Sequence, residues 1–162
     1  MPFPIQTSEG SFLAYYSENG LERLDFPIHR EPKGLLKPAE LPLPMRQWHT
    51  MTTKALEQVL AGHAPEALPP FDLSAGTEFQ QRVWNALRRI TLGKTNSYAE
   101  MAASIGQPKA TRAVGSACGA NPIPVLIPCH RVLAANHRLG GFSGGLDWKR
   151  KLLAREGLLF PD

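Results

Sequence analysis

The first third of the chain alternates short apolar runs with turn residues, a pattern typical of strands. Apolar residues fill much of 12–16 and recur through 21–26, and the dipeptide Asn19-Gly20 lies between these segments. Asn-Gly tolerates the positive φ angles of a two-residue turn, so the pattern predicts a β-hairpin. The stretch 31–44 is rich in proline and charge, which indicates an exposed loop.

Helical spacing begins after this loop. Apolar residues recur every three or four positions from Trp48 to Leu60, and Gly62 is placed to cap the end of that helix. Prolines at 65, 69 and 70 then predict a linker. We therefore expect two domains, the first over residues 1–72 and the second over residues 73–162.

The second domain opens with a capping box. Thr77 is followed by an apolar stripe from Phe79 to Ile90, and this stripe predicts a helix that continues until Gly93.

Two short helices are expected next. Ser97 opens a capping box for a helix that stops at Gly106, and Pro108 suits the first position of a helix that ends near Gly119. Helices joined this way predict a helix-turn-helix, whose second helix normally faces DNA. Its second helix is rich in alanine and glycine, which suits close approach of a DNA backbone or tight packing against another helix.

Charge is distributed unevenly along the 162 residues. Residues 1–76 carry 6 Lys and Arg against 9 Asp and Glu, whereas residues 77–162 carry 12 against 5. A basic second half favours an anionic partner such as nucleic acid, and a solvated basic face is the alternative. Only two cysteines occur, with no secretory signal and no apolar run near the length of a membrane span. We therefore predict a cytoplasmic protein with no membrane partner.

The sequence PCHRV at residues 128–132 sets a thiol beside an imidazole and a guanidinium. Cys129 would become nucleophilic if His130 accepted its proton or if Arg131 supplied a positive field, and a buried structural cysteine is the alternative. Three prolines in 121–128 exclude a helix or a central strand there. We expect a stiff extended segment that holds Cys129 in a fixed place.

Six short blocks, in order and spacing, closely resemble the O⁶-alkylguanine-DNA alkyltransferases, which are direct-reversal DNA repair proteins. They are SY at 97–98, PKATRAVG at 108–115, NPIP at 121–124, PCHRV at 128–132, FSGG at 142–145 and LAREG at 153–157. The resemblance implies an α+β fold. A ribonuclease-H-like N-terminal domain would precede a helical, winged-helix-like C-terminal domain that contains the helix-turn-helix.

The resemblance also implies the reaction. A methyl or other alkyl group would pass irreversibly from O⁶ of guanine, with O⁴ of thymine as a further candidate, to Cys129 in one turnover. The partner would be double-stranded DNA that carries the lesion, with no cofactor. We expect a monomer in solution, and cooperative binding to DNA stays open.

Site roles follow from the same resemblance. Cys129 resembles the nucleophile, His130 the base that takes its proton through a water, and Glu156 the carboxylate that orients the imidazole. Asn121 is similar to the residue that organises the active-site turn, and Tyr98 to the group beside the flipped base.

The resemblance also implies contacts with DNA. Arg112 resembles the side chain that fills the vacated base stack, and Ser143 a pocket residue that meets O⁶. The predicted DNA-binding set is Tyr98, Gln107, Arg112, Thr111, Gly115, Ala135 and Ser143.

The chain departs from the family at several points. Residues 1–76 contain no cysteine, so the zinc site that some members carry there cannot form, and we predict no metal. A Cys118, Cys129, His130, His137 site matches no common zinc spacing. For Cys118, a structural role in helix packing is favoured over a chemical role. Phe142 replaces the tyrosine of many members, and the resemblance implies a place for Leu139 in the pocket wall, so we expect both positions to influence which adducts fit.

Three other functions are compatible with parts of this sequence. Alkyltransferase-like proteins bind alkylated DNA without reacting, but they carry another residue in place of Cys129. A transcription regulator would explain the basic half, yet not the combination of Cys129, His130 and Glu156. A cysteine hydrolase would need a leaving-group or oxyanion motif beyond the Cys-His pair, and the sequence shows none, which weakens this alternative.

Overall fold

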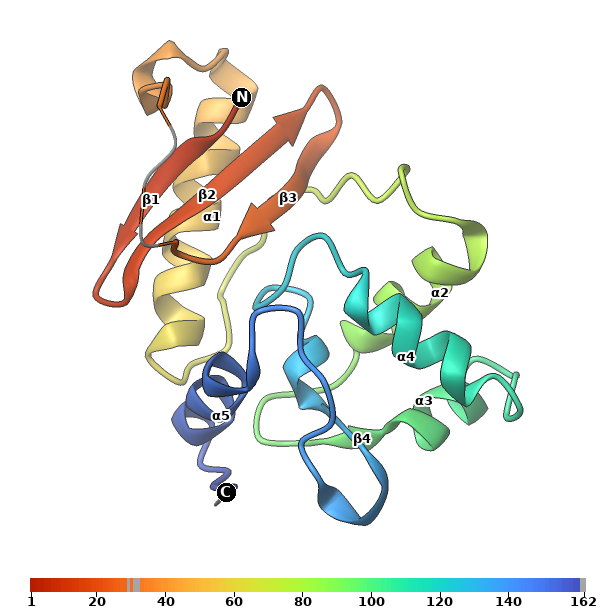
Figure 1. Ribbon diagram of the computed structural model, residues 1–162. Helices are drawn as coiled ribbons and strands as arrows, with labels where there is room; N and C mark the ends of the chain where they lie inside the picture. The colour runs from red at the N-terminus through yellow and green to blue at the C-terminus, as the bar shows by residue number, and fades with distance from the viewer. Residues whose placement is uncertain (29, 31–32, 161–162) are drawn as a thin grey trace.

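The N-terminal part of the protein is a three-stranded antiparallel sheet with one long helix against it (Figure 1). Its strands are β1 (Phe3–Thr7), β2 (Gly10–Ser17) and β3 (Gly20–Asp25), in that spatial order. The computed structural model describes residues 1–28, 30 and 33–160. The hairpin predicted around Asn19-Gly20 is confirmed as β2 and β3, since Ser17 pairs with Gly20. Strand β1, an edge strand that contains Pro4, was not predicted from the sequence.

The long helix α1 (Leu43–Leu60) lies across one face of the sheet (Figure 1). Its buried side chains include Leu56, which packs in one apolar cluster with Phe12 of β2. The helix starts five residues before the predicted Trp48, because Pro42 and Pro44 are compatible with the first turn of a helix. Gly62, with φ +84°, follows the helix end as predicted. A short 3₁₀ turn, η1 (Pro38–Glu40), occupies the predicted loop, of which residues 31 and 32 lie outside the described residues.

The connection after α1 lies along the sheet. The N–H of Leu21 donates to the carbonyl of Pro70, and the N–H of Asp72 donates to the carbonyl of Leu21, both at 2.8 Å. Leu21 and Phe71 thus form an isolated parallel bridge at the edge of β3. The predicted linker is therefore fixed to the first sheet by backbone hydrogen bonds.

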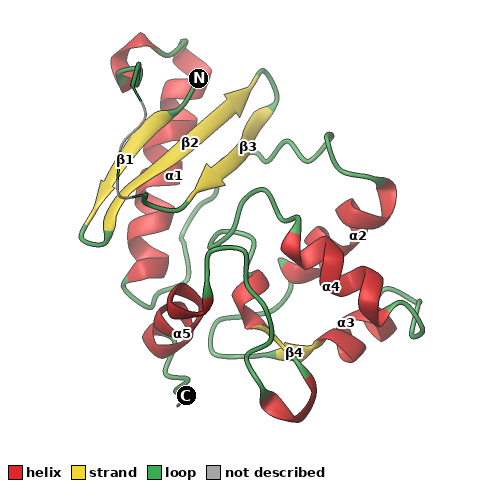
Figure 2. Cartoon of the chain, viewed as in Figure 1, coloured by secondary structure: helices red, strands yellow, loops and turns green. Residues whose placement is uncertain are grey.

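The C-terminal part is mainly helical, with one two-stranded parallel sheet (Figure 2). Its elements are α2 (Glu78–Leu87), β4 (Asn96–Ser97), α3 (Tyr98–Ser104), α4 (Thr111–Gly119), η2 (Cys129–Arg131), β5 (Val132–Leu133), η3 (Ala135–His137) and α5 (Leu146–Arg155). Together with the first sheet, these elements give a mixed α/β architecture. Within the described residues, no helix combines the length and the apolar character that crossing a membrane requires.

Both predicted capping boxes form. Thr77 accepts from the N–H of Gln80, and Ser97 accepts from the N–H of Glu100. The helix after Thr77 ends at Leu87, well before the predicted end at Gly93. Beyond Leu87, residues 88–90 form hydrogen-bonded turns in place of a regular helix.

The start of α4 was also predicted wrongly. The helix begins at Thr111 rather than Pro108, because the N–H of Ala110 donates to the carbonyl of Gln107 at 2.9 Å and closes a separate turn. The helix ends at Gly119, as predicted.

The prediction of a stiff extended segment over 121–128 was wrong, because this stretch is folded into turns. The N–H of Ile127 donates to the carbonyl of Ile123 at 2.9 Å, and Val125 has φ +74°. Prolines exclude a helix there, but they do not exclude successive turns.

Candidate active site

Asn121 holds the turn that carries Cys129. Its Nδ2 donates to the carbonyl of Ile127 at 2.9 Å, and its Oδ1 accepts from the N–H of Ile123 at 3.0 Å. The N–H of Cys129 also donates to the carbonyl of Ile127, at 2.8 Å. Because the amide is buried and uses both its donor and its acceptor, it fixes the backbone just before the thiol.

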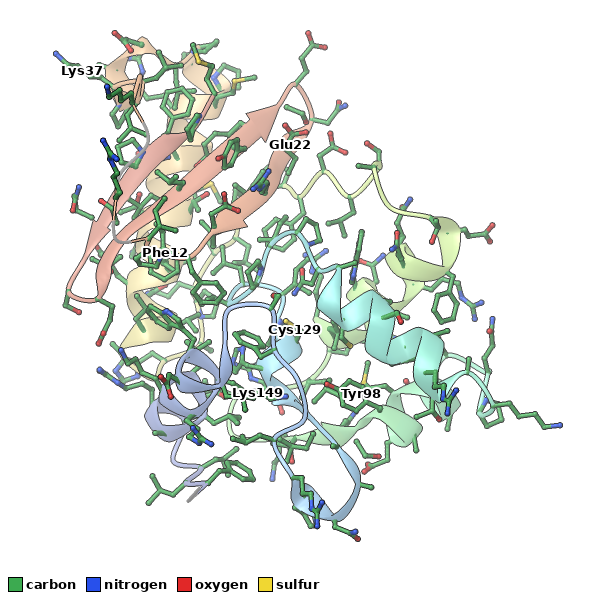
Figure 3. All side chains as sticks on the ribbon, viewed as in Figure 1. Phe12, Glu22, Lys37, Tyr98, Cys129 and Lys149 are labelled. Carbon is green, nitrogen blue, oxygen red and sulfur yellow. The ribbon has the colours of Figure 1, made fainter. Side chains whose placement is uncertain are left out.

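Cys129 lies on the wall of a pocket of about 470 Å³ between α4 and the loop before α5. Figure 3 shows Cys129 near the centre of the molecule, with Tyr98 and Lys149 labelled nearby. Only 4% of Cys129 is exposed, so a reagent must enter this pocket to reach the sulfur. The lining residues are Tyr98, Gly115, Cys118, Gly119, Cys129, Gly141, Phe142 and Ser143.

Four of the predicted site residues therefore meet in one cavity. Tyr98, Gly115, Cys129 and Ser143 come from four separate segments of the sequence. Gly115 faces the ring of Tyr98, since a Cβ added there would lie in ordinary van der Waals contact with the ring edge, at 3.9 Å. Burial raises the pKa of the Tyr98 phenol to about 12, so this group is a protonated hydrogen-bond donor at neutral pH.

His130 points away from solvent, toward the carboxylate of Glu156. Its Nε2 lies 3.5 Å from Oε2 of Glu156, and the two side chains are 0% and 1% exposed. Neither ring nitrogen of His130 has a hydrogen-bond partner among the described protein atoms. Burial lowers the pKa of the imidazole, while the carboxylate of Glu156 opposes this shift. His130 is thus a neutral base beside a fixed negative charge.

Arg131 is the main partner of Glu156, and this pairing was not predicted from the sequence. Its Nε donates to Oε1 of Glu156 at 2.7 Å, a second guanidinium nitrogen contacts the same oxygen, and Nη1 donates to the carbonyl of Ile90 at 2.6 Å. The positive charge of Arg131 is therefore paired with Glu156. We assign Arg131 to holding this carboxylate, in place of the expected role of supplying a positive field to the Cys129 thiol. Burial raises the pKa of Glu156, but His130 and Arg131 outweigh it, so the pKa is lowered overall.

Lys149 is a site residue that sequence reasoning missed. The side chain is fully buried, and its Nζ donates to the carbonyl of Val132 at 2.7 Å and to that of Gly141 at 3.3 Å. Lys149 precedes the buried Leu152 and Leu153 by three and four positions. Residues three and four positions apart share one face of a helix, so this spacing already indicated that Lys149 lies on the apolar face of α5.

The charge of Lys149 acts on the two thiols of the pocket. Burial raises the pKa of Cys129, whereas the Asn121 amide and the Lys149 ammonium lower it in part. Burial also raises the pKa of Cys118, to about 12, so this thiol is protonated at neutral pH. The pKa of Lys149 itself falls to about 8 because of burial.

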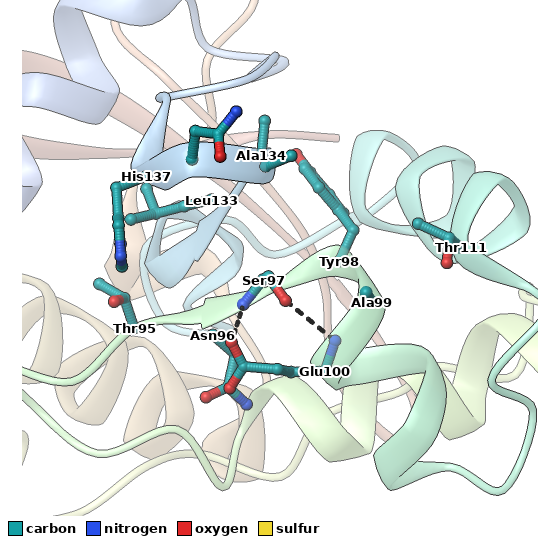
Figure 4. A pocket seen from close by; sticks show the side chains of 12 residues that line it. Thr95, Asn96, Ser97, Tyr98, Ala99, Glu100, Thr111, Leu133, Ala134 and His137 are labelled. Carbon is teal, nitrogen blue, oxygen red and sulfur yellow. Dashed lines mark hydrogen bonds between the residues drawn. The ribbon is translucent and has the colours of Figure 1, made fainter.

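A second hollow of about 510 Å³ lies on the other side of Tyr98 (Figure 4). It is lined by Ser97 of β4, by the first turn of α3, including Glu100, and by residues 133–137. The predicted DNA contacts Thr111 and Ala135 also lie here. Tyr98 lines both hollows, so an extended ligand can lie across this surface while one part of it enters the Cys129 pocket.

The remaining predicted residues lie outside these two hollows. Gln107 is exposed in the turn between α3 and α4, and Arg112 is exposed on the first turn of α4. His137 lines the second hollow, away from the wall that holds Cys118 and Cys129. Among the described residues, no group of three or more His, Cys, Asp or Glu side chains is arranged to hold a metal ion.

Comparison with known proteins places this arrangement in a family. Residues 78–158 match the 6-O-methylguanine DNA methyltransferase DNA-binding domain. A methylated-DNA–protein-cysteine methyltransferase of Methanosarcina acetivorans is 42% identical over 91% of this chain and 92% of its own. The crystal structure of Mycobacterium tuberculosis OGT in complex with DNA covers 96% of this chain and 91% of its own, with 36% identity and a TM-score of 0.79. An O⁶-methylguanine DNA methyltransferase of Methanococcus jannaschii superposes with a TM-score of 0.69 at 30% identity, over 99% of this chain and 96% of its own. The chain therefore belongs to the methylated-DNA–protein-cysteine methyltransferase family.

Proposed function

We propose that this protein repairs DNA by moving an alkyl group from O⁶ of guanine in a duplex to the sulfur of Cys129. The observation that carries the proposal is the position of Cys129 on the wall of a pocket large enough for a base, in a chain that belongs to this family. The acceptor sulfur is consumed, so each molecule acts once and needs no cofactor.

The transfer is a displacement at the alkyl carbon. The proton of Cys129 passes to His130 through a water molecule, and the thiolate attacks the carbon in line with the bond to O⁶. The new S–C bond forms as the C–O bond breaks, and the electron pair of that bond stays on guanine. The buried carboxylate of Glu156, 3.5 Å from Nε2 of His130, stabilises the imidazolium that results.

Departure of guanine needs a hydrogen-bond donor near the base. Tyr98 lines the pocket and keeps its proton at neutral pH, so its phenol can donate to the anionic base. Ser143 lines the same pocket, and we infer that its hydroxyl meets O⁶. Asn121 keeps the turn before Cys129 fixed, which maintains the line of attack.

DNA binding uses the exposed side of the helix pair α3 and α4. We infer that α4 approaches the duplex with Arg112, and that Gln107, Thr111, Gly115 and Ala135 complete the contact surface. The net positive charge of residues 77–162 supports an anionic partner. The reactive carbon cannot reach a buried thiolate while the base is stacked, so the nucleotide must be flipped into the pocket, and Arg112 fills the gap.

We also propose the finer description of the fold and of its setting. The antiparallel strands with α1 across one face support a ribonuclease-H-like first domain over residues 1–72. The helix pair and the segment around η3 support a winged-helix-like second domain over 73–162. Both cysteines are free, which suits a reducing, cytoplasmic location, and we propose that the protein acts as a monomer.

One experiment tests the proposed function. The protein is incubated with duplex DNA that contains a single O⁶-methylguanine, and its intact mass is measured. We expect the mass of one methyl group on the Cys129 peptide, complete loss of this gain in Cys129→Ser, and its retention in the matched variant Cys118→Ser. An unchanged mass with intact DNA binding would refute transfer and favour a non-catalytic binder of alkylated DNA.

A further inference from the structure

Two aromatic side chains of the N-terminal part and two of the C-terminal part pack into one cluster. Phe12 lies in β2 and Phe26 directly follows β3, whereas Phe142 lies in the loop before α5 and Trp148 lies in α5. The ring centroid of Phe26 is 5.6 Å from that of Phe12, 5.7 Å from that of Phe142 and 5.0 Å from that of Trp148. At these separations aromatic rings are in packing contact. Phe26 therefore connects the first sheet to the loop 141–145.

The same ring lies directly against the backbone of Gly144. A Cβ added to Gly144 would lie 2.5 Å from Cε2 and 2.8 Å from Cδ2 of Phe26. No real Cβ tolerates such distances, so the absence of a side chain at 144 lets the ring come this close. Phe26 thus contacts both Phe142 and Gly144, on either side of Ser143.

This loop forms one wall of the pocket that contains Cys129. Gly141, Phe142 and Ser143 all line the cavity. The N–H of Gly145 donates to the carbonyl of Phe142 at 3.0 Å, and Lys149 donates to the carbonyl of Gly141 at 3.3 Å. These bonds restrain the loop, while Phe26 packs against its middle from outside the pocket.

We propose that Phe26 of the N-terminal part is a positioning residue that sets the width of the Cys129 pocket, and thereby the size of the alkyl group that is transferred. The inference rests on the proposed function, because the pocket is taken as the alkyl-acceptor site. Phe26 does not line that pocket. It acts through Phe142 and the backbone at Gly144.

Removing the ring should loosen the wall in a way that depends on the size of the adduct. In Phe26→Ala, Phe142 loses its packing partner and can move into the space left behind. A small methyl group then loses alignment with the sulfur, whereas a benzyl group gains room. We expect the ratio of benzyl to methyl transfer rates to rise by about tenfold, because misplacement of about 1 Å in an active site is enough for such losses.

The test compares Phe26→Ala with Phe3→Ala, a matched control. Phe3 is a buried aromatic residue of the same sheet, and its ring contacts are with Tyr16 and His49 rather than with the wall. Single-turnover rates are measured at saturating DNA for one duplex that carries O⁶-methylguanine or O⁶-benzylguanine. Phe26→Tyr, which keeps the ring, should restore the wild-type ratio. An unchanged ratio in Phe26→Ala, or an equal change in Phe3→Ala, would overturn the inference.

A second measurement reads the pocket without alkyl transfer. In a Cys118→Ser background, Cys129 is labelled with iodoacetamide and with a bulky pyrene maleimide, and the ratio of the two rates reports the width of the entrance. Phe26→Ala should raise the relative rate of the maleimide. If the wild-type protein transfers no alkyl group, the proposed function fails, but the ratio of labelling rates still tests whether Phe26 sets the width of the pocket. If transfer occurs and neither ratio changes, only the further inference fails.

Gly144 offers an independent approach to the same contact. Gly144→Ala should push the ring of Phe26 away and slow transfer, since its new Cβ meets the ring. In the double variant Phe26→Ala/Gly144→Ala, the added methyl group enters the vacated space. The double variant should therefore react faster than the two single changes predict together. Independent effects of the two changes would contradict direct contact control of the wall.

Discussion

Replacing Glu156 by Gln should destabilise the protein far more than a typical surface change. The carboxylate is 1% exposed and is paired with Arg131, which is 8% exposed. Removing one partner of a buried ion pair costs about 3–5 kcal/mol, because the other charge stays buried without compensation. Arg131 keeps its bond to the carbonyl of Ile90, so we expect the lower end of that range, about 3 kcal/mol.

The assay is urea unfolding at neutral pH, with Glu66→Gln as the matched control. Glu66 pairs with Lys54 at 3.0 Å, but these side chains are 71% and 65% exposed, so its loss should change the free energy of unfolding by less than about 1 kcal/mol. Equal effects of the two substitutions would refute the reasoning that burial makes the Arg131–Glu156 pair important.

The pH dependence identifies charge as the cause. The pKa of Glu156 in the folded protein lies below its ordinary value of 4.5. Its contribution to stability is thus present above pH 4.5 and is lost as the pH falls through the folded pKa. The difference between wild type and Glu156→Gln should shrink below pH 4.5. The variant should also transfer alkyl groups about tenfold to hundredfold more slowly, because His130 loses the carboxylate that favours its protonated form. A difference in stability that is constant with pH would indicate loss of shape rather than of charge.

Three further predictions concern the pocket and the DNA surface. Lys149→Met removes a positive charge that lowers the pKa of Cys129, so the rising limb of the rate against pH should move to higher pH, as measured by single-turnover transfer; an unmoved limb would exclude this electrostatic role. Arg112→Ala should slow repair of a duplex lesion even at saturating DNA, yet leave reaction with free alkylated base nearly intact, and full recovery at saturation would make Arg112 a phosphate contact only. Cys118→Ser should keep more than about half of the wild-type rate, because burial keeps this thiol protonated at neutral pH and Cys129 is the proposed acceptor; a loss as large as that of Cys129→Ser would contradict this assignment.

Elements with local signals could be predicted from the amino-acid sequence. Capping at Thr77 and Ser97 involves residues three positions apart, and both capping boxes form as predicted. The hairpin at Asn19-Gly20 follows from the backbone freedom of that dipeptide. The family resemblance was equally accessible, because its six blocks are contiguous in the sequence, and it named Cys129, Tyr98, Gly115 and Ser143, which the fold brings into one pocket.

Features that depend on packing between distant segments could not be predicted, because such packing has no local signature in the sequence. The turns over 121–128 depend on the Asn121 amide, and proline content could exclude only regular elements there. The partner of Arg131 was not apparent because Glu156 lies 25 positions away in the sequence. Lys149 is one of several basic residues in its helix, and burial against the carbonyls of Val132 and Gly141 distinguishes it. The contact of Phe26 with Gly144 exists only because folding packs the first sheet against the loop before α5.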